Sequence, residues 1–93
     1  MDELKTFRNE IDLIDEQMQT LFLKRMEIVE SIANFKMAND LTVYDHNREE
    51  EVIQKNLLKI ENSEFFEYYE EVLRTILKVS KEYQKRLIIR STL

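Results

Sequence analysis

The sequence contains no glycine, no proline and no cysteine, and histidine occurs once, at position 46. Without glycine and proline, tight hairpins and glycine-dependent turns are nearly excluded, whereas long uninterrupted helices form easily. Without cysteine, the chain has no disulfide, no zinc–thiolate site and no thiolate nucleophile. The lone His46 also excludes a metal site built from several histidines. These absences favour an all-α fold.

The 93 residues include 19 acidic and 14 basic side chains, which gives a formal net charge of −5. This excess of negative charge argues against binding to a nucleic acid through its phosphate backbone. No apolar run approaches the roughly 20 residues that span a bilayer, and the first residues lack the basic and apolar regions of a signal peptide. We therefore expect a cytoplasmic protein that binds neither nucleic acid nor membrane, with residues 1–93 forming a single domain.

Apolar residues recur at alternating intervals of three and four in the first part of the chain. This apolar seam consists of Leu4, Phe7, Ile11, Ile14, Met18, Leu21, Ile28, Ile32 and Phe35, and Arg25 occupies one of its positions. The spacing predicts a helix over about residues 3–38, roughly 54 Å long. A rod of that length cannot fold back on itself, so other helices must cover its seam. Since a compact monomer of this size has a marginal core, an oligomer interface would help.

Two breaks in the apolar period divide the rest of the chain. Asn39 and Asp40 tolerate the left-handed conformation that ends a helix where glycine is absent. Asp45 can then cap a second helix, whose early turns carry acidic residues 49–51. Residues 62–64 (Asn-Ser-Glu) indicate a second break and cap, and a third helix follows to about Arg90. The pattern therefore predicts three helices: long, short and long.

The informative residues are polar side chains where the period expects apolar ones. Arg25 lies on the apolar seam, and Lys36 follows eleven residues later, within about 20° of the same helical face. Ser80 and Gln84 form an i, i+4 pair on the apolar stripe of the third helix. Each has an ordinary structural explanation. Arg25 can set the register of packed helices or form an interhelical ion pair, and Lys36 can be a solvated charge at the helix end. Ser80 and Gln84 can form hydrogen bonds to the backbone or to each other. Together, cations and hydrogen-bond donors facing a core are typical of a site for a small carboxylate-rich ligand.

Four further polar positions also have ordinary structural explanations. Arg8 lies about 25 Å along the helix from Arg25 and roughly 100° around it. No ligand of metabolite size can touch both in one chain, so Arg8 is either a surface residue or part of a site on a partner. Arg48 and Glu49 are either first-turn surface residues or members of the same site. Asp45 is a sufficient helix cap without any further function.

At several points in register, the sequence resembles the all-helical (type II) chorismate mutases. Residues 7–15 (FRNEIDLID) look like the family's opening, arginine-x-x-isoleucine-aspartate-x-isoleucine-aspartate. Arg25, Lys36 and residues 43–49 (VYDHNRE) follow at the family's spacings, and Ser80 and Gln84 fall where the family has its serine and glutamine. The resemblance covers nearly the whole chain. One departure is residues 46–47, where many members have a proline, so we expect the second helix to start less rigidly.

The resemblance implies an intertwined six-helix homodimer with two equivalent sites that convert chorismate to prephenate in phenylalanine and tyrosine biosynthesis, on the shikimate pathway. It implies that Arg25 binds one carboxylate of the substrate and that Arg8 of the partner subunit binds the other. Arg48 and Ser80 are then expected to support the carboxylate environment.

The same resemblance assigns the rest of the site. Glu49 and the backbone near Asp45 are expected to hold the ring hydroxyl, and Lys36 and Gln84 to donate hydrogen bonds to the ether oxygen. The reaction is a unimolecular rearrangement, so it needs positioning and electrostatic stabilisation rather than a nucleophile or a general base. Neither a metal nor an organic cofactor is expected.

Two other functions stay open. Isochorismate pyruvate lyase uses the same fold and a similar cationic pocket, although its relatives generally lack the pair corresponding to Arg48 and Glu49. A non-catalytic helical dimerisation module would explain the apolar seam. It would not explain the polar residues on the seam and on the third helix.

Overall fold

The structure is a computed structural model that describes residues 2–92, and its regular elements are all helices. Helix α1 spans Asp2–Ala38, α2 spans His46–Leu57, the 3-10 turn η1 spans Ser63–Phe65, and α3 spans Phe66–Ser91. The predicted order of a long, a short and a long helix is therefore confirmed. Within the described part of the chain, no helix is both long and apolar enough to cross a membrane.

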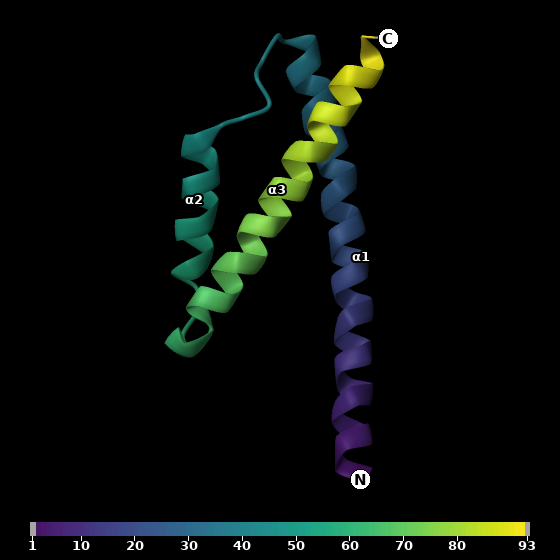
Figure 1. The fold of residues 1–93 in the computed structure, drawn as a ribbon, viewed down its shortest axis with the longest axis vertical. Coiled ribbons are helices and arrows are strands. Elements are labelled where there is room, and N and C mark those ends of the chain that lie inside the picture. The colour runs from purple at the N-terminus through teal and green to yellow at the C-terminus, as the bar shows by residue number, and fades with distance from the viewer. Residues whose placement is uncertain (1, 93) are drawn as a thin grey trace.

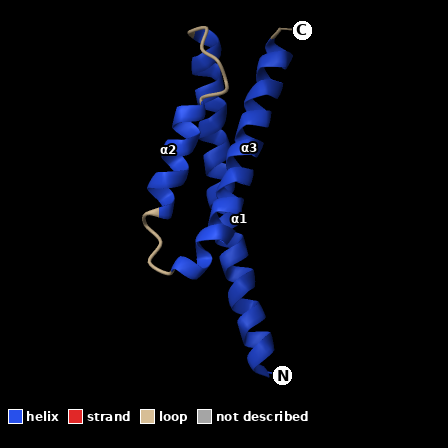
Figure 2. Ribbon diagram, turned by 60° about the vertical axis from the view of Figure 1, so that its left-hand side comes forward, coloured by secondary structure: helices blue, strands red, loops and turns tan. Residues whose placement is uncertain are grey.

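Helix α3 is the central element of the chain. It packs against both α1 and α2, and Figure 1 shows it crossing the C-terminal half of α1 while α2 lies on its other side. The N-terminal half of α1 extends past the other two helices without a neighbour, as Figure 1 and Figure 2 both show. Helix α3 therefore joins α2 to the C-terminal half of α1.

The loop between α1 and α2 is bounded by two local devices that the sequence predicts. Asp40 takes a φ of 54°, in the left-handed region. The amide of Leu41 then donates to the carbonyl of Lys36 at 2.8 Å, which closes α1 with a Schellman motif. Asp45 caps α2, because its carboxylate accepts the backbone N–H of Arg48 at 3.0 Å.

The core of the single chain is small and partly polar. Among the described residues, its buried apolar side chains are Val29, Ala33, Ile53 and Leu73. Two polar side chains of α3, Ser80 and Gln84, are buried with them. Since buried polar groups normally form hydrogen bonds, we expect hydrogen-bond partners for these two side chains between α3 and α1.

The face of α1 that packs on α3 lies beside the apolar seam and shares only its edge, at Arg25. Val29 and Ala33 are buried there, whereas the neighbouring seam residues Ile28 and Phe35 are both 62% exposed. In the N-terminal half, the seam residues from Leu4 to Leu21 are between 49% and 63% exposed. Adjacent positions on a helix differ by about 100°, so the two stripes lie side by side. The other helices of the same chain therefore leave most of the seam uncovered.

The chain is extended for its size. Its dimensions are 55 × 27 × 14 Å, and its radius of gyration is 16.9 Å, against about 12 Å for a compact domain of this length. Its accessible surface is 8002 Å², against about 5,800 Å² for a compact monomer of 11.4 kDa. The long axis is that of α1, and the excess surface lies largely along its free half.

Candidate active site

A cleft of about 300 Å³ lies between the C-terminal half of α1, the start of α2 and the C-terminal half of α3. Its apolar walls are side chains of Val29, Ile32, Val43, Val52 and Leu77. Its polar lining consists of Arg25, Lys36, Asp45, Arg48, Glu49, Ser80, Lys81 and Gln84. The structure thus brings together every site residue predicted from the sequence except Arg8. Apolar walls with a few convergent polar groups are typical of a small-molecule site.

Arg25 is fixed across the α1–α3 interface. Its guanidinium donates a hydrogen bond to the Ser80 hydroxyl, which itself donates to the carbonyl of Ile76 at 2.8 Å. Burial lowers the pKa of Arg25, and the nearby positive charge of Arg48 lowers it further. A guanidinium stays protonated in proteins despite such shifts. The cleft therefore contains an oriented, partly desolvated cation that suits an anionic group.

Lys36 is held by the loop that follows α1. Its Nζ donates to the carbonyl of Val43 at 2.9 Å, and the side chain is half-buried. An ammonium carries three donors, so this bond leaves two for a ligand. Lys36 is therefore oriented within the cleft rather than extended into solvent from the helix end.

Gln84 is buried in the cleft wall with its acceptor unpaired. Among the described residues, no group donates a hydrogen bond to its Oε1. Leaving a buried polar atom unpaired costs about 1–3 kcal/mol, and an apolar side chain would avoid that cost. Packing alone therefore does not explain this residue, whose amide also carries two N–H donors.

The start of α2 contributes two oppositely charged side chains. Arg48 lines the cleft and also pairs with the exposed Glu51 of the next turn at 2.7 Å. Glu49 pairs instead with Lys81 of α3, with 3.1 Å between Oε1 and Nζ. We expected the start of α2 to be less rigid because the family's proline is absent. The Asp45 cap and the ion pair between Glu49 and Lys81 of α3 hold this end in place.

Sequence reasoning left Lys81 without a role, although the structure places it in the cleft wall. One signal was available. The residues three and four positions away on its own helix are Leu77, Lys78, Gln84 and Lys85, and none of them is acidic. A lysine with no helical counter-charge and two basic neighbours can form an ion pair only with another element.

Arg8 lies outside the cleft. It is exposed near the N-terminus of α1, beside Leu4, Lys5 and Asn9. This end of the helix projects away from α2 and α3 (Figure 1). Within one chain, Arg8 therefore has no access to a ligand held by Arg25.

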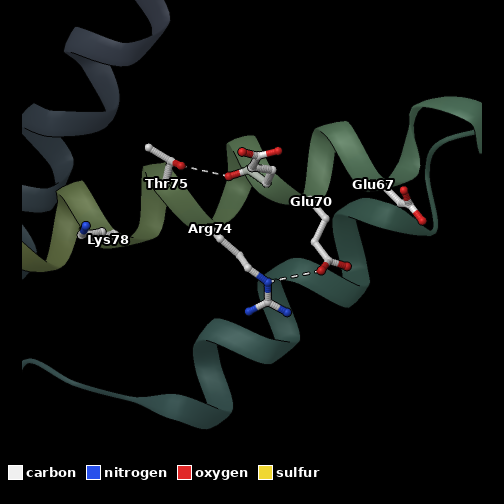
Figure 3. A pocket seen from close by; sticks show the side chains of 6 residues that line it. Glu67, Glu70, Arg74, Thr75 and Lys78 are labelled. Atoms are coloured by element: carbon white, nitrogen blue, oxygen red, sulfur yellow. Dashed lines mark hydrogen bonds and ion pairs between the residues drawn. The ribbon is translucent and has the colours of Figure 1, made fainter.

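A second depression follows another face of α3 and is lined by Glu67, Glu70, Glu71, Arg74, Thr75 and Lys78 (Figure 3). Arg74 bridges Glu70 at 3.3 Å and Glu50 of α2 at 3.4 Å. The hydrogen bond to Glu70 is the main cause that raises the pKa of Arg74. Because the side chains are exposed and Arg74 is paired with two glutamates, we interpret the depression as a solvated, charged face of α3. In residues 2–92, no three potential ligands gather to hold a metal ion.

Comparison with known proteins identifies the family. A family model described as chorismate mutase type II matches residues 7–85. The chain belongs to the type II chorismate mutases. The T-protein of Haemophilus influenzae is 33% identical over 81 residues, which cover 86% of this chain but 22% of the T-protein. The chain thus spans less than a quarter of the length of that relative. No solved structure matches the chain.

Membership of the type II chorismate mutases confirms the resemblance predicted from the sequence. The matched region extends from before Arg8 to beyond Gln84, so it includes all the predicted site residues and Lys81. The role of each side chain stays a prediction that rests on the geometry of the cleft.

Proposed function

We propose that this chain is a chorismate mutase, which rearranges chorismate to prephenate in the cleft between α1, α2 and α3. The observation that carries the proposal is the convergence of three hydrogen-bond donors, Arg25, Lys36 and Gln84, on one small cleft. Chorismate carries two carboxylates, a ring hydroxyl and an ether oxygen, which such groups can bind. Its product would place the chain in phenylalanine and tyrosine biosynthesis on the shikimate pathway.

Binding by these residues supplies the positioning that the reaction needs. The ether C–O bond breaks while a new C–C bond forms in the same molecule, so no nucleophile or external proton is required. Arg25 pairs with one carboxylate, and Glu49 accepts a hydrogen bond from the ring hydroxyl. Holding the side chain over the ring converts a rare conformer into the bound one.

Lys36 and Gln84 supply the electrostatic part. As the C–O bond breaks, negative charge grows on the ether oxygen, and both side chains donate hydrogen bonds to it. Lys36 is already oriented by Val43, so little reorganisation is needed when that charge appears. Since the charge is larger in the transition state than in bound chorismate, these bonds lower the barrier rather than only strengthening binding.

The second carboxylate needs a further cation, which the proposal takes from a second copy of the chain. In an intertwined six-helix homodimer, Arg8 of the partner subunit enters the cleft. The exposed seam supports this arrangement, because a single chain exposes about 2,200 Å² more than a compact monomer would, which is in the range of obligate interfaces. Two antiparallel α1 helices related near residue 19 bring the partner's Arg8 close to residue 30.

One experiment separates this proposal from its alternatives. The purified chain is incubated with chorismate and, separately, with isochorismate, and prephenate and pyruvate are measured. Prephenate from chorismate, without pyruvate from isochorismate, is the expected result, with residues 1–93 acting as one catalytic domain. Pyruvate release from isochorismate alone would make the chain a lyase. Neither product from a folded dimer would make it a dimerisation module.

A further inference from the structure

Lys81 of α3 joins two other elements beside the cleft. Its Nζ lies 3.1 Å from Oε1 of Glu49 on α2, and the two side chains are only 26% and 23% exposed. The same Nζ lies 4.7 Å from the centre of the Tyr44 ring, in the loop between α1 and α2. The Lys81 ammonium therefore contacts both α2 and the loop between α1 and α2, and each of these segments contributes polar groups to the cleft.

The ion pair with Glu49 explains the charge of Lys81. Positions three and four residues away on α3 offer no carboxylate, and two of them, Lys78 and Lys85, are basic. Among the described residues, Glu49 is the carboxylate within salt-bridge distance of Lys81. Without that pair, α3 would have an unopposed cation in a partly desolvated wall, which is unfavourable.

The geometry of the pair leaves Glu49 able to bind a ligand. Lys81 contacts Oε1, so Oε2 is left to accept a further hydrogen bond. A glutamate on the first turns of a helix otherwise has several rotamers open to it, and a carboxylate fixed at one oxygen loses most of them. Glu49 can therefore meet a hydroxyl in the cleft without reorganising.

The contact with Tyr44 extends the same effect to Lys36. Tyr44 follows Val43, whose carbonyl accepts the hydrogen bond from Lys36. The Tyr44 hydroxyl is also 3.0 Å from Nδ1 of His46, at the start of α2. A cation over the ring face restrains this loop, but Tyr44 is 51% exposed whereas the Glu49 side chain is only 23% exposed. The main effect of Lys81 therefore passes through Glu49.

We propose that Lys81 is a positioning residue, an inference that rests on the proposed mutase function. Lys81 holds one carboxylate oxygen of Glu49, so that the other oxygen accepts a hydrogen bond from the ring hydroxyl of the substrate. Its charge is largely neutralised by Glu49, so it adds little direct attraction for the substrate carboxylates. The cleft thus contains an ion pair that orients the neutral ring hydroxyl of the substrate, beside Arg25, which binds one of its carboxylates.

The test is a double-mutant cycle on the full chain, with the KM and kcat for chorismate measured for each variant. Lys81→Met is expected to raise KM about 10-fold and to change kcat less than about 3-fold, because the hydroxyl contact is made in the ground state and the transition state alike. Lys81→Arg keeps the cation but can bind both oxygens of Glu49, so it should restore KM only in part. In a Glu49→Gln background, adding Lys81→Met should raise KM less than about 2-fold further.

Two controls keep the cycle interpretable. Lys85→Met removes a charge from an exposed position of the same helix and should leave both constants unchanged. Lys81→Gln removes the charge while keeping a polar side chain, and the same rise in KM is expected if the methionine variant does not fold. An equal effect of Lys81→Met with and without Glu49 would show that Lys81 acts on the substrate directly and would overturn the inference. So would an unchanged KM. A wild-type chain without mutase activity would instead overturn the proposed function, and this inference with it.

Discussion

Arg25 of α1 and Ser80 of α3 are joined by a hydrogen bond from the guanidinium to the hydroxyl. Because that hydroxyl donates to the Ile76 carbonyl one turn earlier, its oxygen is left as an acceptor that faces Arg25. The pair lets a charged side chain lie in the α1–α3 interface, where an unpaired cation would be costly. It also fixes the direction of the guanidinium before any ligand arrives.

Replacing Ser80 with alanine should therefore weaken substrate binding more than it slows the reaction. Loss of one hydrogen bond to a charged group predicts a rise in KM of about 10-fold, with kcat changed less than about 3-fold. Thr75→Ala is the matched control, since its hydroxyl makes the same bond to the carbonyl four residues earlier on an exposed face of α3. A lower kcat at unchanged KM would show that Ser80 does not act through binding.

Lys36→Ala should remove most of the activity at every pH. The variant loses a preorganised donor to the ether oxygen, and such losses reduce kcat by about 100- to 1,000-fold. Lys55→Ala, which removes an exposed charge near the end of α2, should leave kcat unchanged. A Lys36→Ala variant that retained a large part of the wild-type kcat would place the charge stabilisation elsewhere.

Gln84→Glu should make the reaction depend on acid. A neutral amide donates at any ordinary pH, whereas a carboxyl donates only when protonated, and its ionised form repels the charge that develops on the ether oxygen. Since the ordinary pKa of a glutamate is about 4.3, the ratio of variant to wild-type kcat should rise as the pH falls toward that value. A ratio that stays constant from about pH 8 to pH 4.5 would remove Gln84 from the site.

Local chemistry made much of the fold predictable. Asp40 ends α1 and Asp45 begins α2 because the conformation of each is set by its own short side chain. The apolar period could not show which of two adjacent stripes of α1 packs within the chain. Val29 and Ala33 offer small, close-packing side chains to α3, and the larger seam residues are left for a different neighbour.

The site was predictable only where its residues broke a pattern. Arg25 and Gln84 are polar at positions where the period expects apolar side chains, so the sequence alone distinguishes them. Lys81 breaks no apolar period, and its partner Glu49 lies 32 positions earlier, on another helix. The apolar period of a helix does not show how that helix is rotated against its neighbour, so it cannot predict which side chains of two helices meet.

The stability of the chain should depend on its own concentration. If the seam is buried between two copies, the midpoint of thermal unfolding should rise with protein concentration, because dissociation and unfolding are coupled. Ile14→Glu places a charge on the seam and should abolish the dimer together with most of the helical signal. Thr20→Glu places the same charge about 120° around α1 from Ile14, off the seam, and should have a smaller effect. A folded monomer at low concentration would contradict this.

We propose that Arg8 of the partner subunit completes each cleft, and mixing two inactive variants tests this shared site. Arg8→Ala and Lys36→Ala chains are unfolded together, refolded, and assayed for prephenate. In a mixed dimer, the cleft of the Arg8→Ala chain keeps its own Lys36 and receives an intact arginine from its partner. Half of the dimers are mixed and half of their sites are intact, so about a quarter of the wild-type activity should return. If mixed dimers are present by mass and no activity returns, Arg8 does not serve the partner's site.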